Sequence, residues 1–443
     1  ARRVLIIGGG FVGLECARRL ANDERFEVTL VDRTNHHLFQ PLLYQVATAS
    51  LAAPDIARSL RQILEEAGNV TVLMDRITGL SLADRTATGD SGYDYHYDYL
   101  VLATGVHTSF FGHPEWEEHT LGLKSLAEAQ AIRRTVLSNL ERAEISSDPG
   151  ERRRLMTVAI VGGGPTGVEL AGAFADLFRR SLRTNFRRID TSKLRVVLVE
   201  GEERILGAYD PDQSSYAERR LTALGVEVRT STRVAKVTGQ CVDLEGGETI
   251  DAAAIVWAAG TEASPLTACL GIPLADRAGR VAPEADLSIP GHPEVFAGGD
   301  LVRVEDDDGR PVPGVAPAAM QMGRHIAKLL KEELRLETTR FADRKHALRP
   351  RFRYFDKGIM AIIGKNAAVV KSGKLRLDGF VAWLAWLFVH ILFLIGFRNK
   401  LSVLLGWAFA YLRDTPDARI IVPAARESSR DGTSNGKGTA RAA

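Results

Sequence analysis

The sequence has few cysteines and almost no net charge. Its three cysteines, Cys16, Cys241 and Cys269, stand alone and form neither a C-x-x-C pair nor a zinc-ligand spacing. This excludes a disulfide framework, fits a reducing compartment and leaves no predicted metal site. Among 443 residues, 57 Lys and Arg oppose 55 Asp and Glu, so the formal net charge of +2 gives no reason to expect a nucleic-acid partner.

The first residues also lack the features of a secretory signal. Arg2 and Arg3 lead through a short apolar run into Gly8, without a long apolar segment or a small-residue cleavage site. We therefore expect the protein to stay in the cytosol. Charged residues make up 25% and hydrophobic residues 45% of the chain, which argues against a disordered chain and against a polytopic membrane protein.

Glycine is abundant, with 41 residues, and its clusters follow predicted strands. Four short, mostly β-branched runs predict buried parallel strands, at 4–7, 28–31, 158–161 and 196–199. They form two pairs. In each pair the first strand ends at a glycine cluster followed by a helical stretch, and the second ends at an acid, Asp32 or Glu200. This pattern predicts a repeated βαβ nucleotide-binding unit.

The first cluster, Gly8-Gly9-Gly10-Phe11-Val12-Gly13, has the form G-x-G-x-x-G at the start of a helix. Its glycines permit a tight turn, the approach of a pyrophosphate to the backbone, and close packing of helix on strand. The helix N-terminus favours the anionic pyrophosphate. Asp32 ends the next strand, where a carboxylate can accept hydrogen bonds from ribose hydroxyls.

The second cluster repeats this arrangement as Gly162-Gly163-Gly164-Pro165-Thr166-Gly167. Its acid, Glu200, lies further along the chain than usual because a basic stretch intervenes, and its charge would favour NADH over NADPH. Glu169 falls in the first turns of the second helix. It either stabilises that helix terminus through the dipole or acts at the reaction centre.

Three more strands end at glycine. The runs ending at Ala103-Thr104-Gly105 and at Ala258-Ala259-Gly260 predict the points where the chain leaves one nucleotide domain and later returns to it. A third run ends at Gly298-Gly299-Asp300, whose backbone N–H and carboxylate can hold a ribityl or pyrophosphate group. Two dinucleotide sites suggest that one holds a tightly bound electron carrier and that the other binds and releases an electron donor.

In this order the motifs resemble the two-dinucleotide-binding-domain flavoproteins. The segments at 36–47, 163–172 and 382–400 more closely resemble a type II NADH dehydrogenase, a single-subunit NADH:quinone oxidoreductase. The resemblance implies bound FAD, NADH as substrate, and quinone reduction without proton pumping. It assigns FAD to Gly8, Gly9, Gly10, Phe11, Val12, Gly13, Asp32, Arg33, His37, Ala103, Thr104, Gly105, Gly299, Asp300 and Ala316. It assigns NADH to Gly162, Gly164, Pro165, Thr166, Gly167, Glu169, Glu200 and Gly260, with Glu169 as the candidate catalytic carboxylate.

The resemblance also implies a quinone site at Ala316, Pro317, Met320 and Gln321. The family usually carries Ala-Gln-x-Ala-x-Gln here, whereas this sequence has Pro317 in place of the first glutamine. Proline has no amide side chain and no backbone N–H, so one hydrogen bond to a quinone carbonyl is in doubt. Gln321 is then the candidate polar contact. The quinone is either menaquinone or ubiquinone.

The predicted fold is α/β, with two Rossmann-like domains and a C-terminal region of amphipathic helices. The expected boundaries are 1–110 and 263–335 for the FAD domain, 111–262 for the inserted NADH domain, 336–425 for membrane association and dimerisation, and 426–443 for a disordered tail. The two rivals are a membrane-tethered NADH-binding redox sensor of the apoptosis-inducing-factor kind and a sulfide:quinone reductase. The second needs paired cysteines near the flavin, which this sequence lacks.

The C-terminal region predicts membrane attachment. Ten Lys or Arg against one acid at 344–376 precede an uncharged run at 379–397 and a shorter one at 401–412. The longer run matches the length of a transmembrane helix, but a mid-run histidine and interfacial tryptophans favour an anchor in the membrane plane on an anionic surface. A buried dimer interface is a further alternative. The candidate membrane residues are Trp383, Trp386, Phe388, Leu392, Phe397, Arg398, Lys400 and Trp407. We expect a peripheral homodimer on the cytoplasmic face of a bacterial plasma membrane.

Overall fold

Two parallel sheets organise the chain. The computed structural model describes residues 1–182, 185–337, 339, 343, 345–413 and 419–421, so the predicted tail at 426–443 lies outside the described residues. The first sheet has the order β19-β20-β9-β1-β2-β5, and its strands are β1 (Arg2–Ile7), β2 (Phe26–Asp32), β5 (Val70–Met74), β9 (Tyr99–Leu102), β19 (Ser288–Ile289) and β20 (His292–Ala297). All neighbours pair in parallel except β19 and β20.

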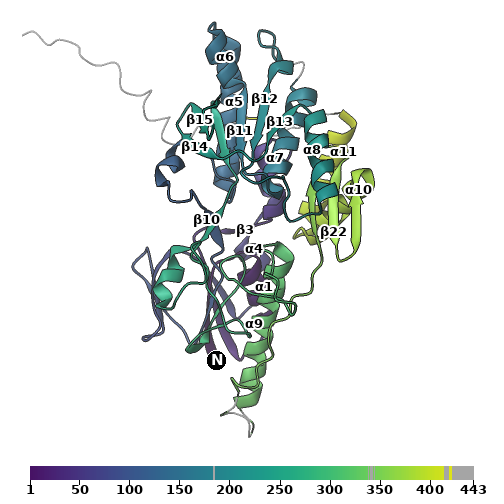
Figure 1. The fold of residues 1–443 in the computed structure, drawn as a ribbon. Helices are drawn as coiled ribbons and strands as arrows, with labels where there is room; N and C mark the ends of the chain where they lie inside the picture. Colours follow the sequence, from purple (N-terminus) through teal and green to yellow (C-terminus); the bar gives the residue numbers. More distant parts are fainter. Residues whose placement is uncertain (183–184, 338, 340–342, 344, 414–418, 422–443) are drawn as a thin grey trace, which may run out of the picture.

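The second sheet is smaller and wholly parallel, and it lies above the first in Figure 1. Its order is β13-β12-β11-β17, with β11 (Thr157–Val161), β12 (Arg195–Val199), β13 (Val226–Arg229) and β17 (Ala254–Trp257). Its helices are α5 (Leu126–Ile145), α6 (Pro149–Leu155), α7 (Pro165–Asp176) and α8 (Pro211–Ala223). The four strands predicted from β-branched runs are therefore confirmed, two in each sheet, because only a central parallel strand buries both faces of such a run.

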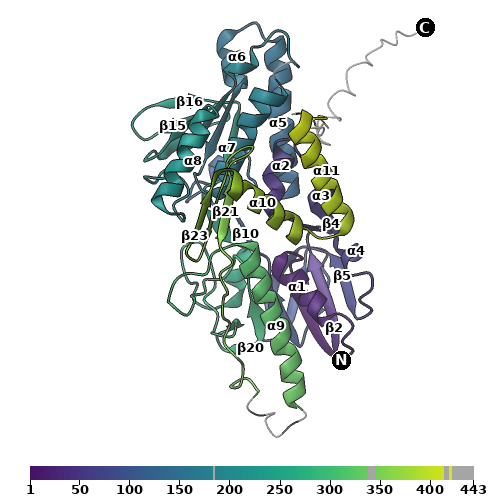
Figure 2. The same cartoon turned by 90° about the vertical axis from the view of Figure 1, so that its right-hand side faces the viewer.

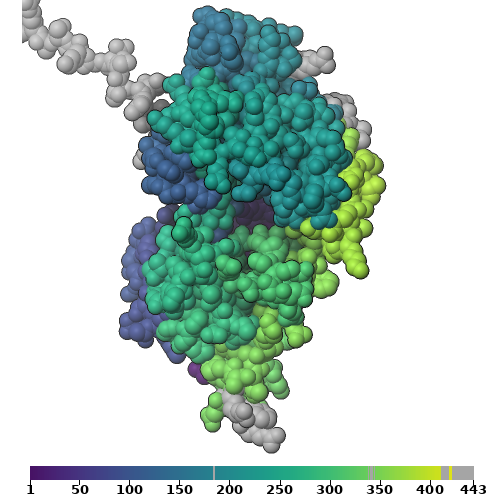
Figure 3. All heavy atoms as spheres, viewed as in Figure 1, coloured from purple at the N-terminus to yellow at the C-terminus, as the bar shows by residue number. Residues whose placement is uncertain are grey.

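Two short strands connect the part of the chain around the first sheet with the part around the second. β10 (Val106–Thr108) and β18 (Thr261–Ala263) pair antiparallel directly after the two glycine stops. The two strands lie where the sequence predicts the crossings between domains, and the domain boundaries stay a prediction. Figure 3 shows a hollow between the two parts.

Helix α1 (Phe11–Leu20) packs along α9 (Ala316–Glu337), as Figure 2 shows. A Cβ on Gly323 would lie 2.4 Å from the carbonyl oxygen of Val12, so glycine permits this close contact. Pro317 falls in the first turn of α9, where a missing N–H breaks no helical hydrogen bond. Short elements fill the connections: α2 (Leu43–Ala47), α3 (Ala53–Ile56), α4 (Leu60–Ile63), β3 (His36–Leu38), β4 (Ala57–Ser59), β6 (Ile77–Ser81), β7 (Thr86–Gly89), β8 (Asp94–His96), β14 (Val234–Val237), β15 (Cys241–Leu244) and β16 (Thr249–Asp251).

The C-terminal part is an antiparallel sheet followed by two helices. The sheet contains β21 (Ile359–Ile362), β22 (Ala368–Ser372) and β23 (Leu375–Asp378), and the helices are α10 (Gly379–Phe393) and α11 (Phe397–Arg413). The 19-residue uncharged run therefore does not form one helix, because α10 ends at Phe393. Among the described residues, no helix combines the length and apolar character that crossing a membrane requires.

One predicted membrane residue was placed wrongly. Trp386 is fully buried, because Ala382, Trp386 and His390 share the face of α10 that packs inward. The Trp386 ring stacks on His390 at 3.9 Å between centroids. Burial lowers the pKa of His390 to about 4, so the imidazole in mid-run is neutral at pH 7 and is a core group.

Candidate functional site

The first glycine loop, residues 8–13, packs closely against neighbouring backbone atoms. Gly8 has φ +108°, and a Cβ there would lie 2.3 Å from the carbonyl oxygen of Ala103. A Cβ on Gly13 would lie 1.9 Å from the carbonyl oxygen of Gly8, far inside contact distance. A Cβ on Gly10, by contrast, would meet no atom within 4 Å. The loop therefore packs tightly on its own strand and leaves open space on the side where a ligand can approach.

Asp32 holds this loop from the neighbouring strand. Its Oδ2 accepts a hydrogen bond from the backbone N–H of Gly9 at 2.6 Å, and its Oδ1 accepts from the N–H and hydroxyl of Thr34 at 2.7 and 2.8 Å. His37 lies beneath the loop, with its Nδ1 3.0 Å from the carbonyl oxygen of Gly9, and burial lowers its pKa. Asp32 thus fixes the conformation of the loop through contacts within the protein.

A cavity of about 650 Å³ runs along this loop. Twelve of the fifteen residues predicted to surround FAD line it, namely Gly8, Gly9, Gly10, Phe11, Val12, Asp32, Arg33, Ala103, Thr104, Gly105, Gly299 and Asp300. The other three, Gly13, His37 and Ala316, do not line it. The buried hydroxyl of Thr104 has no hydrogen-bond partner among the described residues. A cavity of this size at a helix N-terminus, with an unpaired hydroxyl on its wall, fits a dinucleotide such as FAD.

Sequence reasoning missed several residues of this cavity. Lys124, Ser125 and Ser264 also line it, from segments outside the glycine motifs. The only sequence signal was the capping pattern Ser125-x-x-Glu128, which predicts the start of a helix. It does not predict where that helix points.

The second glycine loop has the same construction. Gly162 has φ +112°, and a Cβ on Gly167 would lie 1.8 Å from the carbonyl oxygen of Gly162. Glu200 Oε2 accepts a hydrogen bond from the N–H of Gly163 at 2.6 Å, which matches the contact between Asp32 and Gly9. Pro165 begins α7. The longer spacing before Glu200 therefore does not displace it, because β12 pairs in parallel with β11 up to Val161 and Val199 and so ends beside the loop.

The predicted quinone residues lie on the first two turns of α9, where Met320 and Gln321 have different surroundings. Met320 lines a cavity of about 420 Å³ with Phe11 and His37. The Gln321 amide pairs with the backbone of Phe355, donating to its carbonyl at 3.0 Å and accepting from its N–H at 2.9 Å. Both ends of that amide are therefore occupied within the protein.

Glu169 lies on α7, one turn after the second glycine loop, and lines a larger cavity. The N–H of Ile362 donates to its Oε1 at 3.3 Å. The residue is half-buried, and desolvation of its carboxyl raises the pKa to about 8. The Glu169 carboxyl is therefore largely protonated at pH 7 and can donate a proton.

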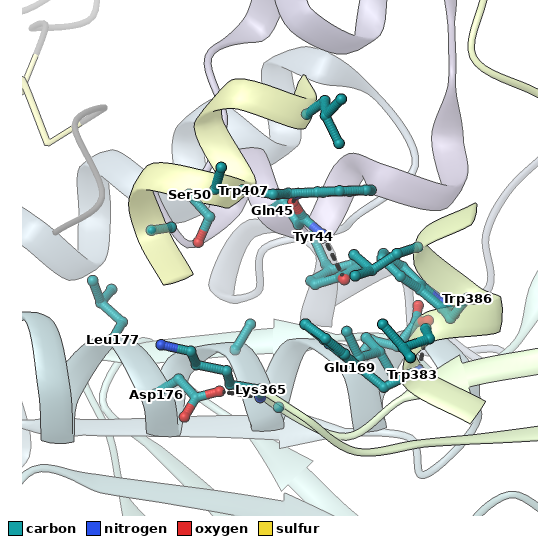
Figure 4. Close-up of a pocket in the computed structure, with 18 of the residues that line it drawn as sticks. Tyr44, Gln45, Ser50, Glu169, Asp176, Leu177, Lys365, Trp383, Trp386 and Trp407 are labelled. Atoms are coloured by element: carbon teal, nitrogen blue, oxygen red, sulfur yellow. Dashed lines mark hydrogen bonds between the residues drawn. The ribbon is translucent and has the colours of Figure 1, made fainter. Parts of the chain in front are cut away.

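The cavity beside Glu169 measures about 700 Å³ and is mostly apolar (Figure 4). It lies among α2, α7, α10 and α11. Trp383, Trp386 and Trp407 line it, and Asp176 and Lys365 lie toward the end away from Glu169. The polar groups nearer Glu169 form a chain that the sequence did not reveal. Trp407 Nε1 donates to Gln45 Oε1 at 2.8 Å, and Gln45 Nε2 donates to the Tyr44 hydroxyl at 2.9 Å.

The outer faces of α10 and α11 expose a set of large apolar side chains, which we call the apolar row. Its members are Phe380, Val381, Leu384, Phe388, Leu392, Phe397, Leu401, Leu404, Leu405 and Phe409. Of the predicted membrane residues, Phe388, Leu392, Phe397 and Arg398 are exposed, whereas Trp383, Lys400 and Trp407 are half-buried. A patch this large is uncommon on a soluble monomer and marks an interaction surface.

Known proteins share this sequence and fold. Residues 2–323 match the family model of the pyridine nucleotide-disulphide oxidoreductases. The type II NADH:quinone oxidoreductase Ndh of Mycobacterium tuberculosis is 40% identical over 421 residues, covering 93% of this chain and 88% of the relative. An internal alternative NAD(P)H-ubiquinone oxidoreductase A1 of Arabidopsis thaliana mitochondria is 29% identical over 440 residues, covering 93% of this chain and 85% of the relative. The solved structure of NDH2 from Plasmodium falciparum in complex with NADH has the same fold, with a TM-score of 0.85 at 18% identity, covering 95% of this chain and all of the other.

The alignment with the mycobacterial relative continues beyond residue 323, where the family model ends, through α9 and into the C-terminal helices. The chain therefore belongs to the pyridine nucleotide-disulphide oxidoreductase family and, within it, to the type II NADH:quinone oxidoreductases.

Proposed function

We propose that the protein oxidises NADH and reduces a membrane quinone at three adjoining sites. FAD would occupy the cavity along the first glycine loop, where Asp32 and Asp300 face its ribose and ribityl hydroxyls. NADH would bind the second loop, where the carboxylate of Glu200 disfavours a 2′-phosphate. FAD supplies hydride acceptance and electron transfer when bound. The protein's residues position the two nucleotides and exclude water.

We place the quinone in the apolar cavity beside Glu169. The segment that carries Gln40 on the wall of the FAD cavity continues into Tyr44 and Gln45 on the wall of the apolar cavity. Glu169 lies on α7 one turn after the second glycine loop, where NADH would bind. The apolar cavity therefore adjoins both the FAD cavity, through the segment of Gln40, and the NADH loop, through Glu169. Quinone reduction takes up protons, and a carboxyl with a pKa of about 8 can deliver one. The single observation that carries this placement is the position of the Glu169 carboxyl on the wall of a mostly apolar cavity.

A blocking variant tests the placement. Ala173 lines the apolar cavity from α7, one turn beyond Glu169, and Ala173→Phe should fill the channel without touching either glycine loop. We expect the quinone KM to rise at least about tenfold, the loss of roughly 1.4 kcal/mol of binding, while NADH-dependent ferricyanide reduction is retained. Met320→Phe in the smaller cavity is the matched control. If Met320→Phe raises the quinone KM and Ala173→Phe does not, the quinone binds instead in the cavity that Met320 lines.

Glu169→Gln tests the proton role by pH. The native carboxyl keeps its proton up to about pH 8, whereas the unfolded chain releases it near 4.5. The native state therefore binds more protons across this window, so stability should fall as pH rises from about 4.5 to 8 and then level off. Glu169→Gln should remove this slope in urea unfolding of the holoenzyme. It should also slow quinone reduction while sparing ferricyanide reduction; unchanged quinone turnover would remove the proposed role.

We further propose that the protein lies on a membrane surface through the apolar row, with its basic C-terminal segment near anionic headgroups. The apolar cavity lies between α10 and α11, which carry that row, so a quinone could pass from the bilayer into the protein. The cytoplasmic face of the plasma membrane and assembly as a homodimer stay predictions.

One assay separates this function from its rivals. NADH oxidation with a water-soluble quinone, recorded with the visible flavin spectrum, should show turnover and bleaching of a bound flavin. A flavin that is reduced by NADH but not reoxidised by quinone would favour the redox sensor. A disulfide-dependent sulfide reaction finds no support, because the cysteines are free and only Cys269 lines the FAD cavity.

A further inference from the structure

Lys124 is a charged residue in the FAD cavity that the steps above do not use. It stands immediately before α5 and lines the cavity that Asp300 also lines. Its ammonium group forms no hydrogen bond or ion pair with any residue that the structure describes. A half-buried lysine without a partner is costly, so its position calls for a reason.

The position of Lys124 is fixed by the start of α5. Glu128 Oε2 accepts hydrogen bonds from the N–H groups of Lys124 and Ser125 at 2.8 and 2.6 Å, and the Ser125 hydroxyl accepts from the N–H of Glu128 at 3.2 Å. This reciprocal cap holds the first residues of the helix rigidly. Lys124 is therefore presented to the cavity by a well-defined backbone.

Helix α5 belongs to the second sheet. Its Asn139 side chain donates to the carbonyl oxygen of Ala253 at 3.1 Å, just before β17. The FAD cavity, in contrast, is formed mainly by the first sheet and its loops. Lys124 thus belongs to the part of the chain around the second sheet, and it places a positive charge in the cavity of the first sheet, where FAD would bind.

The charge balance within the cavity involves Lys124 and Asp300. Burial lowers the pKa of Lys124, and the nearby Asp300 carboxylate opposes that shift. Burial likewise raises the pKa of Asp300, and Lys124 and Arg280 oppose it. The Asp300 carboxylate adds negative charge to a cavity that would also hold the FAD pyrophosphate, and a cation lining the same cavity offsets the repulsion between them.

We propose that Lys124 is a positioning residue for FAD, whose ammonium group balances Asp300 and the cofactor's pyrophosphate and so couples the NADH-binding half to the bound flavin. The proposal rests on the location of FAD given above. A fixed positive charge near the flavin also favours the reduced cofactor, which carries additional negative charge. Lys124 therefore contributes to both FAD affinity and the flavin reduction potential.

Titration of the apoprotein with FAD tests the proposal, with the dissociation constant read from flavin fluorescence and the midpoint potential measured on the reconstituted holoenzyme. Lys124→Met should weaken FAD binding by about tenfold or more and lower the midpoint potential. Lys124→Arg, which keeps the positive charge, should retain most of the FAD affinity and most of the midpoint potential. Lys124→Met combined with Asp300→Asn should lose less than the sum of the two single variants, because the remaining partner is no longer an unbalanced charge.

Lys193→Met, at a side chain that is 78% exposed, is the matched control and should leave both quantities unchanged. Thermal unfolding of each apoprotein separates misfolding from weak binding. Wild-type affinity and potential in Lys124→Met, or strictly additive effects of the two cavity substitutions, would overturn the proposal. Failure of the wild-type chain to bind FAD at all would instead reject the location of the cofactor.

Discussion

Gly167→Ala is expected to keep its FAD and lose NADH oxidation. A Cβ at this position would lie 1.8 Å from the carbonyl oxygen of Gly162, so α7 must shift away from β11 to accept a methyl group. That shift would move the helix N-terminus and the N–H groups that we propose hold the NADH pyrophosphate. Because a displacement of about 1 Å at a binding site can cost 100-fold in rate, we expect kcat/KM for NADH to fall by about that factor.

The matched variant is Gly13→Ala in the first loop. Its Cβ would lie 1.9 Å from the carbonyl oxygen of Gly8, and here we expect loss of bound FAD and of all activity. Gly207→Ala is the control, since no atom lies within 4 Å of its Cβ position. Visible absorbance reports FAD content, and stopped-flow reduction by NADH reports the second site. FAD loss in Gly167→Ala, or normal NADH reduction in it, would contradict the division of roles between the loops.

The sequence predicted the two glycine loops and the strands before them well because their constraints are local. Gly8 and Gly162 need positive φ, and the third glycine of each loop needs direct contact between helix and strand, so the residue types and spacings are nearly fixed. The strands beside them bury both faces, which leaves an unmistakable β-branched run. These features do not depend on distant parts of the chain.

The walls of the cavities could not be predicted in this way. Lys124 enters the FAD cavity because α5 packs on the other sheet, and Trp407 meets Gln45 across 362 positions of sequence. Trp386 illustrates the same limit on one helix. Composition suggested an interfacial tryptophan, whereas the inward face of α10 buries it against His390. Which face of an almost wholly apolar helix points inward depends on its neighbours, since such a helix has little amphipathic signal of its own.

This packing also changes how the membrane proposal should be tested. Deleting the chain from Gly379 onward would remove Ala382, Trp386 and His390 from the protein interior, so loss of function could simply reflect unfolding. Substitutions within the apolar row avoid that problem. Leu401 and Leu405 are 45% and 49% exposed, and they lie one turn apart on α11, so charged residues can replace them at small cost to the fold.

The double variant Leu401→Glu/Leu405→Glu should therefore release the protein from anionic vesicles. Each leucine withdrawn from the bilayer loses about 1.5–3 kcal/mol, and each new negative charge adds about 1 kcal/mol of repulsion. The total of at least about 5 kcal/mol corresponds to more than about a thousandfold weaker binding in vesicle sedimentation. NADH-dependent ferricyanide reduction should persist, while reduction of quinone held in the vesicles should fall with binding. Ile145→Glu/Leu274→Glu, which charges two exposed apolar positions away from α10 and α11, should sediment like wild type. If the Leu401→Glu/Leu405→Glu protein still sediments in high salt, the apolar row is not the membrane contact, and a protein partner becomes the better explanation for its exposure.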